Sequence, residues 1–444
     1  MENQFAYYLK LLQDEVRQRS EEGCNVQDFA PRLEKATYIE ELNHLYDQLS
    51  KLEPASGYVE PSTLPEIRKV CLMEPMRMEI TYSDTELRNR ILGGWLGRCA
   101  GCQLGKPVEG WTYDQIRDHL ERWSNWPLDN YFSEKIFSPK EREEWSAANL
   151  GSMREHLRIA NRDDDQDYTI LGISILEEFG IDFTTEQVGF KWQLALPYQQ
   201  VYTAERQAYR NLVEGFSPPE TALRWNPYRE WIGAQIRADS FGYAAPGWPE
   251  KAAEFACRDA VLSHVKNGIY GEMFVAAMIS TAFVKDNIQD CIQVATKEIP
   301  YGSRFSEMVK DCLKWASLYK DWEKARTEVV QKYGNYHGVH TLNNAALVVL
   351  ALLFGQKDFE KTVCLAVSGG WDTDCNGATA GSILGTMLGA NTLPEKWISP
   401  LNDTIQSAVF GFGEAKISDL AERTFQVAKK VLRGGNRENI RNCA

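Results

Sequence analysis

Two segments of the sequence carry a glycine at every fourth position, and this pattern constrains the fold more than any other feature. The stripes are Gly93, Gly97, Gly101 and Gly105, and Gly377, Gly381, Gly385 and Gly389. Residues four apart share one face of an α-helix, so each helix would present bare backbone that a neighbour can approach closely. Each interior glycine costs about 1 kcal/mol relative to alanine, which tight packing must offset. Because Arg90, Arg98 and Lys106 interrupt the first apolar run, we place the stripes in a soluble bundle rather than in lipid.

The remaining pattern predicts an all-α protein, because apolar residues recur at helical spacing and alternating strand patterns are scarce. We expect a helical N-terminal extension and linker over residues 1–80, one large multi-helix domain over 81–432, and a polar tail over 433–444. Three prolines within 54–66 forbid a continuous helix there and identify that stretch as the linker.

Composition excludes several classes of protein. A net charge of −13 opposes binding to nucleic acid, whose phosphates attract basic surfaces. No uninterrupted apolar stretch is long enough to predict a transmembrane helix, and the first residues lack the basic and apolar segments of a signal peptide. The ten cysteines show no disulfide-framework spacing, and we interpret Cys99 and Cys102 as packed thiols rather than a zinc or redox pair. We therefore expect a cytoplasmic protein with no membrane or nucleic-acid partner.

The candidate chemistry lies in two aspartate clusters about two hundred residues apart. The clusters comprise Asp163, Asp164, Asp165 and Asp167, and Asp372 and Asp374. Carboxylates at this density repel one another and are costly in a compact fold unless a cation neutralises them. Oxygen ligands favour Mg²⁺, Mn²⁺ or Ca²⁺ over zinc. The alternative is that these residues only cap helix N-termini through the helix dipole. We favour a metal site that both clusters form together, because a rigid glycine-striped helix follows the second one.

Four blocks of the sequence, in order, carry a resemblance to a known family. They are the glycine-rich segment 90–110, the cluster 163–167, the segment 232–237 with Ser263-His264 downstream, and the block 371–376. Together they resemble the ADP-ribosylglycohydrolases, related to dinitrogenase reductase-activating glycohydrolase, over roughly residues 85–430. The resemblance implies a compact orthogonal all-α fold, a central metal site usually holding two Mg²⁺ ions, and hydrolysis of an ADP-ribosyl bond at the ribose anomeric carbon.

The resemblance also implies roles for individual residues. The implied metal ligands are Asp164, Asp165, Asp372 and Asp374, with Asp163 as a further carboxylate. Glu109 occupies the loop position where several members carry a catalytic or gating glutamate. We expect Glu109 and Asp164 to be the acid/base residues. The alternative for Glu109 is a solvated loop residue.

Substrate contacts are expected in the middle of the chain. The predicted substrate-binding residues are Gly233, Ala234, Gln235, His264, Asn267, Gly268, Tyr270 and Trp371. Backbone amides at 233–235 could take phosphate oxygens, and the aromatic residues within 225–248 could stack a base. The alternatives are that these aromatics belong to the core, and that Asn267-Gly268 is only a turn signal.

The sequence departs from the family pattern at four positions. Asp163 and Gln166 stand where the family usually has threonine, Cys375 stands where a threonine ligand is expected, and Cys102 stands where many members have aspartate. Because cysteine is a poor ligand for Mg²⁺, the site would hold either one or two ions, with Mn²⁺ as an alternative. The expected substrate is an ADP-ribosylated protein or a small ribosyl compound. The departures leave two other functions open: hydrolysis of a small nucleoside or N-glycoside, and a catalytically inactive binding protein on the same fold.

Overall fold

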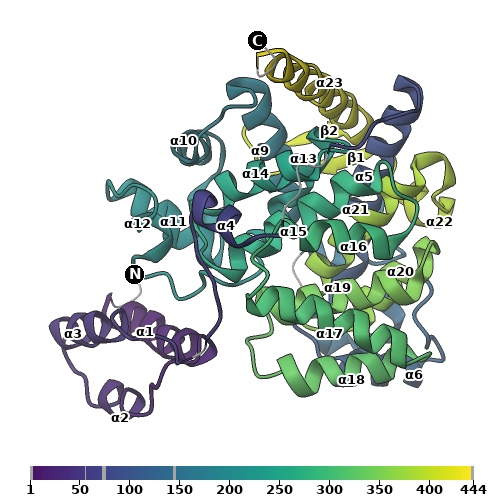
Figure 1. Ribbon diagram of the computed structural model, residues 1–444. Helices are drawn as coiled ribbons and strands as arrows, with labels where there is room; N and C mark the ends of the chain where they lie inside the picture. The colour runs from purple at the N-terminus through teal and green to yellow at the C-terminus, as the bar shows by residue number, and fades with distance from the viewer. Residues whose placement is uncertain (1–3, 56, 73–76, 144–146, 442–444) are drawn as a thin grey trace.

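The protein is all-α, as the sequence predicts. The computed structural model describes residues 4–55, 57–72, 77–143 and 147–441 (Figure 1). These residues form 23 α-helices, six short 3-10 helices and one two-stranded antiparallel sheet. Among them, no helix combines the length and apolar character needed to cross a membrane.

The first half of the chain is a succession of helices and short 3-10 turns. The N-terminal helices are α1 (Gln4–Glu21), α2 (Ala30–Leu33), α3 (Ile39–Leu49) and α4 (Leu64–Val70). They are followed by α5 (Asp84–Gly105), η1 (Lys106–Val108), α6 (Tyr113–Arg122), η2 (Glu134–Ile136), α7 (Pro139–Glu143), α8 (Ala147–Gly151), α9 (Asp164–Phe179), α10 (Thr185–Ala195), η3 (Tyr198–Gln200), α11 (Thr203–Val213) and α12 (Glu220–Leu223).

The second half contains the buried helices and the small sheet. Its elements are η4 (Gln235–Arg237), α13 (Ala238–Ala244), α14 (Pro249–Ala260), α15 (Asn267–Ala282), α16 (Ile288–Thr296), α17 (Arg304–Leu318), α18 (Trp322–Tyr333), α19 (Thr341–Gly355), α20 (Phe359–Ser368) and α21 (Thr373–Leu388). The chain ends with η5 (Ala390–Thr392), α22 (Glu395–Ile398), η6 (Ser399–Leu401), β1 (Thr404–Gln406), β2 (Glu414–Lys416) and α23 (Ile417–Arg441).

Helices α5 and α21 pack directly against each other through the two glycine stripes. A Cβ atom added to Gly101 would lie 1.9 Å from the carbonyl oxygen of Gly377, and one added to Gly97 would lie 2.2 Å from that of Gly381. Because Gly93 meets Gly385 in the same way, the two helices run antiparallel. The predicted bare faces are therefore confirmed for three pairs of glycines, whereas Gly105 packs on the backbone of Thr373. Gly389 does not belong to the helix face: it follows the last residue of α21 with a φ of +79°, and its added Cβ would meet the side chain of Asn89.

Buried helices surround this pair. Helices α15, α19 and α20 contact α21, and α23 contacts α5 (Figure 1). Every residue of α15 is buried, which is typical of a helix that is apolar on all sides. Buried polar contacts also cross this core: the indole Nε1 of Trp95 in α5 donates to Thr424 Oγ1 in α23 at 3.0 Å, and Tyr243 in α13 bonds Ser382 in α21. Close packing and buried hydrogen bonds therefore fix the central helices together.

The N-terminal helices α1–α3 lie to one side of the main body (Figure 1). Leucines of α1 and α3 form a separate apolar cluster with Trp225, Tyr228 and Trp231. Beneath this cluster, the buried guanidinium of Arg229 pairs with Glu15 at 2.6 Å and with Glu22 at 2.7 Å. Three of the aromatics proposed for base stacking are thus covered by the N-terminal helices, which favours their interpretation as core.

The predicted linker runs over the body before α4 begins at Leu64. The backbone N–H of Val59 donates to the carbonyl of Gly302 at 3.1 Å. Glu60 accepts from Arg304 at 2.7 Å, and Arg304 also contacts Glu230 at 2.8 Å. The boundary near residue 80 stays a prediction. The residues predicted as a polar tail are helical as far as Arg441, and 442–444 lie outside the described residues.

The glycine contact predicts that Gly101→Ala destabilises the fold. The added methyl group would collide with the backbone of α21, which cannot move without separating the two helices. Overpacking of this kind costs about 1–3 kcal/mol, and more where the backbone is the obstacle. Urea denaturation of the two proteins measures the difference.

Gly413→Ala is the matched control, because nothing lies within 4 Å of a Cβ at that position. An unfolding free energy for Gly101→Ala equal to that of the control would contradict the proposed packing.

Candidate metal centre

The second aspartate cluster is held by a contact between two loops. Trp371 donates its N–H to the carbonyl of Trp111 at 2.7 Å, and the N–H of Gly110 donates to the carbonyl of Trp371 at 2.8 Å. Gly370 and Trp371 have φ values of +83° and +65°, so the chain turns sharply before Asp372. This conformation is costly for tryptophan and persists because the two loops hold it. It places the Glu109 loop beside the start of α21.

The first cluster is held by polar side chains of α5 and of η1, which follows it directly. The guanidinium of Arg98, which is 0% exposed, donates to the carbonyl of Asp165 at 2.5 Å and to Asp165 Oδ1 at 3.2 Å. It also donates to Asp239 Oδ2 at 2.7 Å. Lys106 donates to the carbonyl of Arg162 at 2.9 Å and pairs with the carboxylate of Asp163. Helix α5 therefore contacts α21 through glycines, and Arg98 of α5 together with Lys106 of η1 holds the start of α9.

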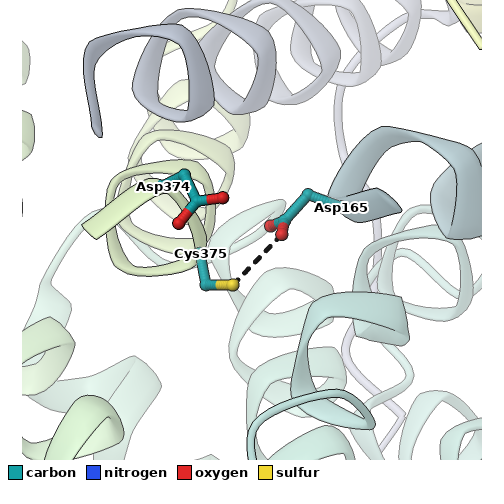
Figure 2. Close-up of side chains that lie close together, drawn as sticks. All are labelled: Asp165, Asp374 and Cys375. Carbon is teal, nitrogen blue, oxygen red and sulfur yellow. Dashed lines mark hydrogen bonds between the residues drawn. The ribbon is translucent and has the colours of Figure 1, made fainter. Parts of the chain in front are cut away.

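The two clusters converge where α9 and α21 begin. Figure 2 shows Asp165 of α9 facing Asp374 and Cys375 of α21, and one ligand atom from each of these three lies within 4.8 Å of the other two. Glu109, Asp372 and Asp374 form a second such group. The predicted meeting of two clusters distant in sequence is therefore present in the geometry.

Few cations compensate these carboxylates. Asp163 pairs with Lys106, and Asp165 shares Arg98 with Asp239. Within the described ranges, no lysine, arginine or histidine lies at ion-pair distance from the other four carboxylates of the site. These four are Asp164, Asp372, Asp374 and Glu109.

The pKa values of the site report this excess of negative charge. The charge of Asp374, followed by burial, raises the pKa of Glu109 to about 9, although its side chain is exposed. Burial and the charge of Asp163 raise the pKa of Asp374 to about 6. Burial raises the pKa of Asp165 and Asp372 well above the usual range. Burial would also raise the pKa of Asp163, but the Lys106 ammonium outweighs it and lowers that pKa.

The residues fit a hard divalent cation. Asp374 Oδ1 is buried and accepts no hydrogen bond from any described residue, which leaves it free to bind a metal. Carboxylate oxygens from three segments face one region, which is a donor set that Mg²⁺ or Mn²⁺ prefers. Asp163 is engaged by Lys106, and Asp164 is half-buried at the first position of α9, outside both ligand groups. Their predicted metal roles stay predictions.

Cys375, one of the departures from the family pattern, contacts the first cluster directly. Its thiol donates to Asp165 Oδ2 at 3.1 Å (Figure 2). Burial raises the pKa of this thiol well above its ordinary value, so the group is a neutral donor in the absence of a metal. Cys102, the other cysteine departure, is also fully buried, and burial raises its pKa in the same way. Cys375 thus orients Asp165.

Three supporting residues were not identified from the sequence. Asn344 Oδ1 in α19 accepts the backbone N–H of Asp372 at 3.2 Å and the side-chain amide of Asn376 at 2.9 Å. Arg98 and Lys106 are the other two. Their signal was available, because two cations at helical spacing within a buried glycine-rich helix need carboxylate partners. Asn344 had no comparable signal.

The predicted substrate-binding residues divide into two groups. Gly233, Ala234 and Gln235 precede Ile236, whose carbonyl accepts from Arg98 as that of Asp165 does. Gly233 itself packs on the carboxylate of Glu205, and the Gln235 side chain accepts from Thr341 Oγ1 at 3.2 Å. Trp371 is half-buried in the loop before Asp372.

The other predicted substrate-binding residues lie in α15 or just before it. Asn267 donates to Glu60 at 2.9 Å and to Glu230 at 3.2 Å, and the Tyr270 hydroxyl donates to the carbonyl of Pro61, so both contact the linker. Gly268 packs on the backbone of Arg229, and His264 is buried with its Nδ1 at 2.8 Å from Ser263 Oγ. The predicted contacts of these residues with a substrate stay predictions.

Comparisons with known proteins identify the family of this chain. A sequence model of the ADP-ribosylglycohydrolase family matches residues 83–433. An Archaeoglobus fulgidus protein described as uncharacterized is 23% identical over 327 residues, which is 72% of this chain and 92% of that protein. A solved ADP-ribosylglycohydrolase-related protein complex is similar with a TM-score of 0.48 and 18% identity, over 78% of this chain and 99% of the solved one. The chain belongs to the ADP-ribosylglycohydrolase family, which suggests glycohydrolase activity on ADP-ribosyl-type substrates.

The geometry predicts that Mg²⁺ or Mn²⁺ stabilises the protein against heat. A cation that binds only the folded state at one hundred times its Kd adds about 2.7 kcal/mol of stability. Asp374→Asn removes a charge that both ligand groups share, so its melting temperature should respond far less to the metal. Differential scanning fluorimetry with and without EDTA measures the response.

Asp118→Asn provides the control, since this exposed carboxylate of α6 is not part of either group. An equal metal response in Asp374→Asn and Asp118→Asn would contradict the assignment of the centre.

Proposed function

We propose that this protein is a metal-dependent glycohydrolase that cleaves an ADP-ribosyl N- or O-glycosidic bond at the anomeric carbon of the ribose. The observation that carries the proposal is the convergence of Asp165, Asp372, Asp374 and Glu109, with a buried, unpartnered oxygen on Asp374. Membership of the family supplies the class of reaction. A site that kept no function would have no reason to retain carboxylates this costly.

The metal would be held by Asp165, Asp372 and Asp374, with Glu109 at the exposed edge. Bound there, Mg²⁺ or Mn²⁺ supplies positive charge that neutralises the carboxylates and polarises substrate or water oxygens. Arg98 and Cys375 keep Asp165 in position from two sides. Asn344 fixes the backbone of Asp372.

Glu109 and Asp164 are the proposed acid/base residues. Both are more accessible than the buried aspartates, so a substrate or a water molecule can reach them. A protonated Glu109 can donate a proton to a leaving group. As a carboxylate it can accept one from the attacking water. The loop contact between Trp111 and Trp371 holds Glu109 beside Asp372 for either role.

The reaction class predicts the effect of Glu109→Gln. This variant keeps the size and hydrogen-bonding capacity of the side chain but cannot exchange a proton. Loss of general acid/base catalysis lowers turnover by about 10²–10⁴-fold. The measurement is release of ADP-ribose from ADP-ribosyl-arginine and ADP-ribosyl-serine, with Mg²⁺ or Mn²⁺ present, alongside cleavage of simple ribosides.

Asp374→Asn and the Asp118→Asn control belong in the same assay. Metal-dependent ADP-ribose release that is lost in Asp374→Asn supports the proposal and identifies the linkage. Riboside cleavage without ADP-ribose release would replace it with a small N-glycosidase. No turnover together with no metal binding would indicate a binding protein instead.

Cys375 belongs to one of the two ligand groups, so we expect its thiol to affect which metal is preferred. Thiol sulfur is a softer ligand than oxygen, so Cys375→Thr should raise the affinity for Mg²⁺ relative to Cd²⁺. The threonine hydroxyl can still donate to Asp165, which keeps that carboxylate oriented. Isothermal titration of both ions into wild type and variant gives the two affinity ratios. An unchanged ratio would mean that residue 375 does not contact the metal.

A further inference from the structure

A cavity separate from the metal centre lies between the loop 126–129 and helices α18 and α20. Its volume is about 410 Å³, within the range typical of small-molecule sites. The indole rings of Trp126 and Trp322, together with Leu128 and Leu365, supply its apolar wall. Ser368, the last residue of α20, also lines it. The proposed glycohydrolase chemistry uses none of these side chains.

The polar lining of this cavity is strongly acidic. Its carboxylates are Asp129, Asp321, Glu323, Asp358 and Glu360, and its one cationic side chain is that of Lys361. They come from three separate segments, so they surround the cavity rather than follow one helix face.

Two of the five carboxylates already have partners. Glu360 pairs with Lys396 and accepts from the Trp397 indole at 3.3 Å. Glu323 accepts the Tyr113 hydroxyl at 2.6 Å, with Arg117 at 3.6 Å.

The other three carboxylates have no cationic partner in the part of the chain that the structure describes. Asp321 and Asp358 cap α18 and α20, each using one oxygen to accept a backbone N–H at 3.0 Å. Asp129 lies in the loop 126–129 and is exposed. These three carboxylates carry three negative charges, and Lys361 offsets one of them. The cavity therefore keeps two uncompensated negative charges. The charge and the apolar wall together select a ligand that carries several positive charges on a hydrocarbon chain.

We propose that this cavity binds an aliphatic polyamine. Protonated amines would approach Asp129, Asp321 and Asp358, and the methylene segments between them would cover the indole and leucine side chains. Ammonium groups also gain from the faces of tryptophan rings. A ligand with two or more charges balances the cavity, whereas an anionic nucleotide would be repelled. The proposal is independent of the metal centre and of its reaction.

The capping geometry allows a clean test. Asparagine caps a helix as well as aspartate does, so Asp321→Asn with Asp358→Asn removes two charges and preserves both helix starts. Spermidine is the probe, and isothermal titration measures its binding to the full-length protein. We expect the double variant to bind at least tenfold more weakly than wild type, and an uncharged aliphatic diol of the same length to show no binding.

Asp374→Asn controls for binding of the amine at the metal centre. Wild-type affinity in this variant, combined with loss in the double variant, supports the cavity. Loss in Asp374→Asn with no change in the double variant would move the polyamine to the metal centre and overturn the proposal. Equal affinity in all three proteins would mean non-specific attraction to an acidic surface and would also overturn it. Circular dichroism confirms that each variant is folded.

Discussion

The contact between α5 and α21 is the constraint on which the rest of the structure depends. Four glycines on one helix lie against the backbone of the other, so the separation of the two axes cannot increase or decrease by more than a fraction of an ångström without losing contact or causing collision. The same two helices define the metal centre: Asp374 lies in the first turn of α21, and the start of α9 is held by Arg98 of α5 and by Lys106, which directly follows α5. A rigid contact made of backbone thus fixes the distance between the two groups of carboxylates.

Charge compensation is distributed unevenly over this frame. Asp163 and Asp165 have buried cationic partners, whereas none of the residues that the structure describes supplies one to Asp372, Asp374 or Glu109. The paired carboxylates keep the local backbone in place, and the unpaired ones are available to a metal and its substrate. The fold pays for this arrangement with raised pKa values in Glu109 and Asp374, because like charges close together favour the protonated form.

Local sequence patterns predicted the helices. The contacts between segments distant in the sequence could not be predicted in this way. The glycine stripes and the helical spacing of apolar residues were sufficient for an all-α fold, since both are properties of single helices. The cost of crowded aspartates, together with the family resemblance, led to the expectation that the clusters meet. The contact of Asn267 and Tyr270 with the linker, and the burial of Trp225 and Trp231 under α1 and α3, depend on which distant segments pack together. No local pattern encodes that choice.

The buried pairs between the N-terminal helices and the body have a consequence for how the protein is made. Glu15 and Glu22 leave the ribosome early, but Arg229, which they neutralise, follows only after half of the chain has been synthesised. Arg304, the partner of Glu60, is synthesised later still. The contact between α5 and α21 also forms late, because α5 is among the first helices to be synthesised and α21 among the last. The nascent chain must therefore hold its early helices in an unfinished state, with apolar and glycine faces accessible, until synthesis is nearly complete.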